Sequence, residues 1–505
     1  MIRIATEQDI ERLRQVALLQ EAENTRLHQR LIQLAQELAA ARGGDAIQVI
    51  QQELAFLQEQ LDVRNRALFG RSSEKRREAA GEDAAGTTAP ARQGHGRRKQ
   101  PELALVDVIH VLDEPDLACP KCGGELKVWD GQFEDSEEID VVERSFRIVR
   151  HRRQKYTCRC AVCIETALGP PKLIPGGRYS VEFAVAVAVA KYADHLPLAR
   201  QVKQMARAGL WVESQTLWDQ LNALAGHLTP TFEALWVEVL GSAVVLADET
   251  QWPLLDKPGS SKWYAWSAAS EKAVAYRILK SRSAEAARTV LDGFDGILVT
   301  DGYIAYKSLR DALARESAGP PPIALAHCWA HVRRKFHDAE PSWPQAKEML
   351  VLIRDLYLVE AEVQDLVGEE RRRRLGELRQ ARSKPLVEAI RMWLACEQAL
   401  PRSGLGKAIS YATAHWDGLV RFLDDARIPL DTNLVERGMR PVAVGRKNHY
   451  GSKSERGTRV AALFYTLIES AKHLGVEPAA YLATATRRAI ENPGTVTLPR
   501  QLSPD

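Results

Sequence analysis

The sequence lacks any apolar run that could cross a membrane. Its longest apolar run is FAVAVAVA at residues 183–190, whereas a membrane-spanning helix needs roughly 20 apolar residues. The opening stretch, MIRIATEQDIERLRQ, also lacks the apolar core of a signal peptide. These two absences predict a cytoplasmic protein that has no membrane partner.

The chain also has little net charge and few cysteines. Its formal charge is only +3 over 505 residues, so total charge does not identify a partner. Hydrophobic residues make up 45% and charged residues 27%, which is typical of globular proteins, and the length allows about three or four domains. Of the seven cysteines, five lie between residues 119 and 163. In a reducing compartment such a cluster indicates a metal site and not disulfide bonds.

Leucines and isoleucines alternate at spacings of four and three residues within residues 1–70. The positions are Leu27, Leu31, Leu34 and Leu38, followed by Ile47, Ile50, Leu54, Leu57 and Leu61. This spacing predicts helices with a coiled-coil seam, interrupted by RGGD at residues 42–45. The alternative is an amphipathic helix packed on the protein's own core. We expect multimerisation, hence a homo-oligomer, because few apolar residues lie off the stripe.

The cysteine cluster lies in residues 103–175, after a stretch, 71–102, whose Ala, Gly and charged residues predict a flexible linker. CPKC contributes Cys119 and Cys122, and YTCRCAVC contributes Cys158, Cys160 and Cys163. Two thiolates from each motif would form a tetrahedral zinc site. Cys160 and Cys163 have the CxxC spacing and are the preferred pair, with Cys158 as the alternative ligand. Buried free thiols are the competing interpretation.

Residues 176–240 predict a group of helices. The stretch PLARQVKQMARAGLWVESQTLWDQLNALAG contains a helix, a turn at Gly209 and a second helix from about Ser214. This pattern resembles a DNA-binding helix-turn-helix. It also describes any short helical hairpin, so both interpretations stay open.

Apolar strands that end in an acid mark residues 241–336. SAVVLADETQW and GILVTDGYIAY are such strands, KWYAWSAAS and AVAYRILK predict a hairpin, and IALAHCWAH is a short strand that runs into a helix. Three strands followed by alternating helix and strand predict a mixed α/β sheet. Residues 337–425 predict an all-helical insertion. Residues 426–475 predict a return to the core, and residues 476–505 a closing helix and tail.

Asp248 and Asp301 each end one of the apolar strands. In an open α/β sheet, chemistry collects at the carboxyl ends of the strands. Two adjacent carboxylates repel each other unless they share a proton or a cation, and Mg²⁺ suits such oxygen ligands. Glu436, an acid inside the basic stretch 431–454, is the candidate third ligand of a two-metal site. In such a site one ion activates the attacking hydroxyl and the other stabilises the leaving oxygen.

Each of these acids has a structural alternative. Asp248 or Asp301 could cap the turn that follows it, and Glu249 should point to the opposite face of an extended strand. Glu436 could form an ion pair with Arg440, one helical turn further on. The basic residues around Glu436 favour the metal interpretation, because they suit the phosphates of a nucleic acid.

The order of the motifs resembles the large transposase of the insertion-sequence-66 (IS66) family of bacterial mobile elements. The matching motifs are LFGRSSEK, CPKCGGEL, LIPGGRYS, KYADHLPLARQ, LADETQW, VTDGYIAY, AHCWAHVRRKF and NLVERGMRPVAVGRKNHYGS. They run in family order from about residue 30 to about residue 490. No single motif is decisive, but their joint order is specific.

This resemblance implies a multidomain α/β protein with an RNase H-like catalytic core and a DDE triad, here Asp248, Asp301 and Glu436. It implies a helical insertion before the last acid, and 134 residues lie between Asp301 and Glu436. It further implies a two-metal site for Mg²⁺ or Mn²⁺, a structural Zn²⁺ and a helical DNA-binding region upstream. The implied chemistry is cutting and joining of DNA ends, first by metal-activated water and then by a 3′-hydroxyl.

The resemblance also implies partners and a location. The DNA partners are the terminal inverted repeats of the element and the target DNA, both double-stranded. Two small accessory proteins encoded in the same element are further expected partners, in a nucleoid-associated bacterial setting. The zinc ligands depart from the family pattern Tyr-x-Cys-x-x-Cys, because Tyr156 leads to Cys158 but residue 161 is Ala.

Several further residues are candidates for contact with DNA. His327 and His331 form an HxxxH pair that can bind zinc, but without a matching acid nearby they predict a support element for DNA or for the active site. The candidate DNA-binding residues are Arg333, Arg334, Arg437, Arg440, Arg446, Lys447 and Asn448.

The predicted function is therefore that of a DNA transposase, a metal-dependent polynucleotidyl transferase and endonuclease. A metal-dependent nuclease on the same fold, without strand transfer, is one alternative, since it shares the first chemical step. A non-catalytic DNA-binding regulator is the other, and it predicts that the three acids are dispensable.

Overall fold

The computed structural model describes most of the chain from residue 146 onward. The described residues are 26, 29, 32–33, 51, 53–60, 146–157, 164–166, 169–255, 261–317 and 319–503. Most of the predicted coiled coil, the whole linker and the cysteines at positions 119, 122, 158, 160 and 163 lie outside them. Within the described part of the chain, no helix has both the length and the apolar character of a membrane span.

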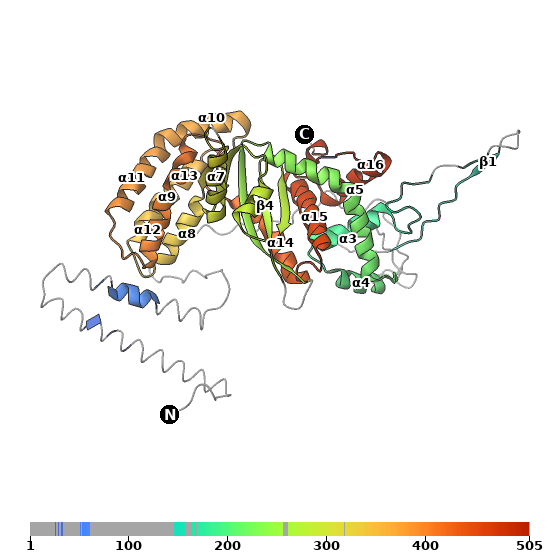
Figure 1. Cartoon of the computed structure of the whole chain (residues 1–505), viewed down its shortest axis with the longest axis horizontal. Helices are drawn as coiled ribbons and strands as arrows, with labels where there is room; N and C mark the ends of the chain where they lie inside the picture. The colour runs from blue at the N-terminus through green and yellow to red at the C-terminus, as the bar shows by residue number, and fades with distance from the viewer. Residues whose placement is uncertain are drawn as a thin grey trace, which may run out of the picture. The chain divides into compact units, whose positions relative to one another are not determined.

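A mixed five-stranded sheet lies at the centre of this part of the chain (Figure 1), with the strand order β5-β4-β3-β6-β7. β3, β4 and β5 pair antiparallel, whereas β6 and β7 run parallel to β3. The prediction of a mixed α/β sheet is therefore confirmed. The bounds are β3 (Val244–Leu254), β4 (Ser261–Ala269), β5 (Val274–Leu279), β6 (Gly296–Thr300) and β7 (Ile323–His327).

The parallel strands are joined by helical crossovers. Ser283 accepts a hydrogen bond from the backbone N–H of Ala286 and caps the first helix of the crossover to β6, as Ser does at helix N-termini. β7 runs directly into the helix that carries His331. The bounds are α6 (Ala284–Val290), α7 (Ile304–Glu316) and α8 (Trp329–Ala339).

Two helices that follow the insertion close the sheet. α14 (Asn433–His449) packs on β3 and β4, and α15 (Glu455–His473) packs on β5. The backbone N–H groups of Val274 and Tyr276, on the edge strand β5, donate to Ser470 Oγ and Thr466 Oγ1 of α15 at 3.1 and 2.9 Å. These bonds occupy two backbone N–H groups of an edge strand that could otherwise pair with a strand of another molecule.

Between α8 and α14 the chain is helical (orange in Figure 1). A buried arginine, Arg379, joins its parts. The guanidinium forms two bonds of 2.8 Å with the carboxylate of Glu360 and donates to the carbonyls of Phe422, Asp425 and Ile428. The bounds are α9 (Ala346–Ala361), α10 (Gly368–Leu378), the π-helical turn η3 (Arg379–Ser383), α11 (Lys384–Cys396), α12 (Gly404–Ala414), α13 (Trp416–Val420) and the 3₁₀ turn η4 (Arg421–Leu423).

Between residues 169 and 243, α3, α4 and α5 precede the sheet, and α4 and α5 are joined by the predicted turn at Gly209, whose φ is +80°. α5 buries side chains along its whole length and packs on α3, α15 and α16. The turn leaves Trp211 83% exposed. The bounds are α3 (Val181–Tyr192), α4 (Leu198–Arg207), α5 (Ser214–Leu240), α16 (Pro478–Glu491) and the 3₁₀ turn η5 (Pro499–Gln501).

Upstream of α3, a short antiparallel pair is formed by β1 (Lys155–Thr157) and β2 (Ile164–Thr166). Thr157 pairs with Ile164. Three of the cysteines, Cys158, Cys160 and Cys163, lie in the sequence between these two strands and outside the described residues.

Candidate active site

The register between β3 and β6 determines where the two aspartates lie. Leu246 pairs with Val299 in this parallel ladder, so Asp248 and Asp301 each follow a paired residue by two positions. Paired residues of parallel strands point to the same face, and that face recurs every second residue. Both aspartates therefore lie at the same height along two adjacent strands, on the same face of the sheet.

The turn that holds Asp301 is fixed from several sides. Asp301 Oδ1 accepts the backbone N–H of Tyr303 at 2.8 Å, and the hydroxyl of Tyr411, from α12, donates to the Asp301 carbonyl. Gly302 has φ +87°, and a Cβ there would lie 2.4 Å from Nε2 of His415. Only glycine fits at this position, since it needs neither the space nor a negative φ.

Glu436 reaches the site from α14, which approaches the sheet closely at Gly438. A Cβ at Gly438 would meet the Tyr276 hydroxyl at 2.7 Å, and that hydroxyl donates to the Gly438 carbonyl at 2.7 Å. Near the start of the helix, Thr432 Oγ1 donates to Glu436 Oε1 at 3.0 Å. The side chain of Glu436 therefore lies in the first turn of α14, where it faces α8.

The ion pairs of Glu436 run to α8. Nδ1 of His331 lies 3.8 Å from Glu436 Oε1, and the guanidinium of Arg334 lies 4.0 Å from Oε2. Arg440, the alternative partner expected from helix spacing, is exposed. The contacts of Glu436 thus join two segments that lie about 100 residues apart in the chain.

Burial and like charges dominate the electrostatics of the site. They raise the pKa of Asp248 from 3.8 to about 7; burial contributes most, followed by the negative charges of Glu249, Asp301 and Glu436. The N–H of Glu249 donates to Asp248 Oδ1 at 2.8 Å and opposes this rise. The negative charges around Asp248 are the electrostatic environment that a divalent cation relieves.

Glu249 is turned to the other face of β3, as strand alternation predicts. Its carboxylate accepts hydrogen bonds from Arg282 at 2.7 Å and from the Tyr306 hydroxyl at 2.6 Å. Burial raises its pKa, while these two donors lower it. Sequence reasoning missed both partners, because nothing local in the sequence links Arg282 or Tyr306 to this strand.

The predicted DNA-binding residues fall into two groups. Arg333, Arg334, Arg437, Arg440 and Lys447 are exposed on α8 and α14, and Asn448 is half-buried. Arg446 is half-buried and donates to Thr250 Oγ1 at 2.9 Å and to the Gln251 carbonyl of β3. Its guanidinium therefore ties α14 to the sheet.

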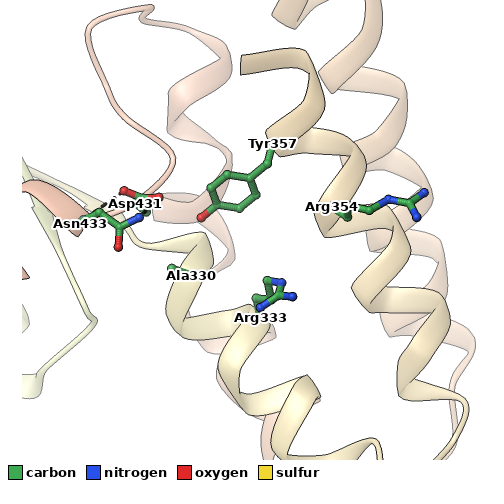
Figure 2. Close-up of a pocket in the computed structure, with 6 residues that line it drawn as sticks. All are labelled: Ala330, Arg333, Arg354, Tyr357, Asp431 and Asn433. Atoms are coloured by element: carbon green, nitrogen blue, oxygen red, sulfur yellow. Dashed lines mark hydrogen bonds between the residues drawn. The ribbon is translucent and has the colours of Figure 1, made fainter. Parts of the chain in front are cut away.

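A cavity of about 280 Å³ lies beside the start of α14, between α8 and α9 (Figure 2). The Tyr357 hydroxyl points toward Asp431 across this space, and burial together with the charge of Asp431 raises the pKa of that hydroxyl. Arg333 is exposed to solvent and also lines this cavity, whose one carboxylate is that of Asp431. The lining residues are Ala330, Arg333, Arg354, Tyr357, Asp431 and Asn433.

The two histidines of the HxxxH pair face different neighbours. His331 faces Glu436, as described above, whereas the ring of His327 packs edge-on against His415 with centroids 4.7 Å apart. Burial and the nearby His415 lower the pKa of His327 to about 4. His327 thus supports the Asp301 turn through His415, because Nε2 of His415 lies within hydrogen-bonding distance of the Gly302 carbonyl, at 3.2 Å.

Two family profiles match this chain. Residues 176–460 match the profile described as "Transposase IS66 family", and residues 116–161 match the profile described as "zinc-finger binding domain of transposase IS66". The second match ends before Cys163.

Three uncharacterized proteins of Sinorhizobium fredii are similar over most of their length. The chain is 34% identical to y4jD over 420 residues, which cover 80% of each protein. It is 35% identical to y4qI over 403 residues (76% of this chain and 73% of y4qI). It is 28% identical to y4hP over 468 residues (87% and 83%).

Proposed function

This chain belongs to the IS66 family of transposases, and on that premise we propose that it is a DDE transposase that cleaves the ends of its element and transfers the 3′ ends to target DNA. Family membership and the zinc-finger match support DNA as its partner. The terminal inverted repeats as the bound sequence, multimerisation through residues 1–70 and contacts with accessory proteins are further parts of this proposal.

One observation carries the proposal: Asp248 and Asp301 lie at the same height on adjacent parallel strands. With Glu436 brought in by α14, this placement supports the proposal of a DDE triad on an RNase H-like core. The raised pKa of Asp248 supports this grouping, because the charges of both other acids contribute to it.

Mg²⁺ or Mn²⁺ fits these residues, since all three offer carboxylate oxygens. Bound there, the metal would supply Lewis-acid activation of the attacking and leaving oxygens of a phosphodiester. Asp248 lies within β3 and Asp301 directly follows β6, so the backbone of both residues is fixed by the sheet. Thr432, at the start of α14, donates to the Glu436 carboxylate, and His331 of α8 faces it at 3.8 Å.

Exposed cations surround this centre and support contact with phosphates. Arg437 and Arg440 lie on α14, one turn or less from Glu436, and Arg334 lies on α8. A second group lies on α4, next to the exposed Trp211, whose ring offers a surface for base stacking. That group consists of Arg200, Lys203 and Arg207.

We expect the α14 arginines to differ in their effect on DNA binding. Arg437→Ala and Arg440→Ala should each weaken binding of the element's end, and each should reduce the slope of log K against log salt by about 1, since each removes one phosphate contact. Arg446→Ala should leave the slope unchanged and lower the melting temperature, because its guanidinium binds Thr250 and Gln251. Fluorescence anisotropy at several salt concentrations measures the slopes. An equal slope change in all three variants would show that Arg446 also grips DNA.

The zinc ligands can be identified by single substitutions. We propose Cys119 and Cys122 together with two of the three cysteines between β1 and β2, and prefer Cys160 and Cys163. Replacing each of the five cysteines between residues 119 and 163 singly by Ser should release the zinc of this site only at its four ligands, because a structural site needs all of them. Zinc content per chain measures this, and retention of zinc in the Cys160→Ser variant would assign the position to Cys158.

Strand transfer in vitro tests the proposed function. The substrate is a labelled duplex that carries the element's own end, incubated with Mg²⁺ and either wild-type protein or the Asp301→Ala variant. Joined products from the wild-type protein alone are expected. Cleavage without joining would favour a metal-dependent nuclease, and DNA binding without cleavage, equal in both proteins, would favour a DNA-binding regulator.

A further inference from the structure

We propose that Cys328, His331 and Glu436 form a second metal site, which takes a thiophilic divalent cation such as Zn²⁺ on the α8 side of Glu436. One ligand atom from each residue (Sγ, a ring nitrogen and a carboxylate oxygen) lies within 4.8 Å of the other two. A thiolate, an imidazole and a carboxylate are a ligand set for Zn²⁺ or Co²⁺, whereas Mg²⁺ prefers oxygen alone.

His331 provides the observation that points to a ligand. Its Nδ1 is buried and forms no hydrogen bond within the described part of the chain. Its distance of 3.8 Å from Glu436 Oε1 is too long for a hydrogen bond. Two atoms that each lie about 2.1 Å from one tetrahedral ion are roughly 3.4 Å apart, so a small movement would let both bind the same cation.

Cys328 is held in place for such a role. It is fully buried at the N-terminal end of α8, one helical turn before His331, so both side chains lie on the same side of the helix. The backbone N–H of Thr432 donates to its Sγ at 3.3 Å. Burial raises the pKa of the Cys328 thiol, and hydrogen bonds from backbone N–H groups at the start of α8 and from Thr432 act in the opposite direction.

The charges around the three residues favour a cation. Asp301 and Glu436 both act on His331 as negative charges, whereas Arg334 and Lys335 act on it as positive ones. The Arg334 side chain is 64% exposed and can turn toward water. Lys335 lies over the ring of Tyr411, with Nζ 4.4 Å from the centroid. Three protein ligands would leave one position of a tetrahedral ion for water or a ligand.

The sharing of Glu436 has a functional consequence that rests on the proposed function. An ion held by Cys328 and His331 would draw Oε1 of Glu436 toward α8, away from Asp248 and Asp301. Zn²⁺ would therefore inhibit a Mg²⁺-dependent reaction, and Cys328→Ser would relieve that inhibition. Binding at the site itself does not depend on this consequence.

Co²⁺ titration tests the site directly. The full-length protein is first saturated with Zn²⁺ at its zinc finger and freed of excess metal, and Co²⁺ is then added while absorption is recorded. We expect a near-ultraviolet thiolate-to-cobalt band and visible bands of tetrahedral cobalt that saturate at about one equivalent. Cys328→Ser should lose the near-ultraviolet band, and His331→Gln should weaken Co²⁺ binding at least about tenfold.

Two controls separate the site from other thiols and from misfolding. Cys396→Ser removes an exposed cysteine on α11 and should leave the bands intact. Glu436→Gln keeps the sulfur and should retain the near-ultraviolet band with weaker binding, so the test does not depend on the folding of Cys328→Ser alone. Absence of the band in wild type, or a band of equal size in Cys328→Ser, would overturn the proposal. No DNA is present, so these outcomes are independent of whether strand transfer occurs.

Discussion

Asp248→Asn is expected to reduce strand cleavage by at least about a thousandfold while stabilising the metal-free protein at pH 8. The first effect follows from the loss of a metal ligand, because about 4 kcal/mol of transition-state stabilisation corresponds to about three powers of ten in rate. DNA binding should persist, since the arginines of α14 are untouched. Gel assays of cleavage and anisotropy measurements of binding check the two expectations separately.

The gain in stability follows from the sign of the pKa shift. The pKa of Asp248 rises from 3.8 to about 7 on folding, so folding favours the protonated form. The folded state carries no penalty below about pH 4, a growing one between pH 4 and 7, and its full penalty above pH 7, on the order of a few kcal/mol. Asn is neutral and nearly the same shape, so it removes this penalty.

Thermal unfolding in a chelator at pH 5.5 and pH 8 measures this gain. The melting temperature of Asp248→Asn should exceed that of wild type, and by more at pH 8 than at pH 5.5. Mg²⁺ should then stabilise the wild-type protein more than the variant. Asp295→Asn, which changes an exposed acid just before β6, should leave the melting temperature nearly unchanged. A lower melting temperature for Asp248→Asn at pH 8 would contradict the electrostatic argument.

Arg379→Met is expected to destabilise the protein by about 3–5 kcal/mol, since it leaves a half-buried carboxylate and three carbonyls without their partner. The Arg379 side chain is only 1% exposed and holds Glu360 in a bidentate pair. It also binds the carbonyls of Phe422, Asp425 and Ile428, just before the segment that leads into α14. Losing these hydrogen bonds should therefore also displace Glu436 and lower the rate of DNA cleavage.

Urea unfolding compares this variant with a matched control from the same π-helical turn. Arg382 pairs with Glu362, but its side chain is 50% exposed, so Arg382→Ala should cost less than about 1 kcal/mol. A double variant, Arg379→Met with Glu360→Met, should recover part of the loss because no unpaired charge remains. Equal destabilisation by Arg379→Met and Arg382→Ala would refute this account.

The strands that carry the two aspartates could be predicted because their signal is local: each aspartate follows a short apolar run, and such runs become buried strands. Asp301 directly follows β6, as predicted. The prediction that Asp248 ends its strand is wrong, because β3 continues to Leu254 through its antiparallel pairing with β4. Glu436 gave no comparable signal, since helix spacing alone favoured a pair with Arg440. The basic residues around it made it the candidate third ligand, and the resemblance to the family supported that hypothesis.

The surroundings of the acids could not be predicted from local patterns. His331 and Cys328 reach Glu436 from a helix about 100 residues earlier, and Tyr411 reaches Asp301 from the helical insertion. Arg446 looked like its basic neighbours in the sequence, yet its side chain is bound to β3. Such contacts depend on how α8, α12 and α14 pack on the sheet, which a single sequence does not encode in any short stretch.

The position of Glu436 so late in the chain affects how the protein is made. Chains emerge from the ribosome N-terminus first, so the cysteine segment, α4 and both aspartates are synthesised before the last acid. The side chains of α15 that satisfy the β5 edge come later still. On the proposed function, a nascent or truncated polypeptide would therefore hold DNA without being able to cut it. Such fragments would compete with complete copies for the same ends, so incomplete translation would restrain the mobility of the element.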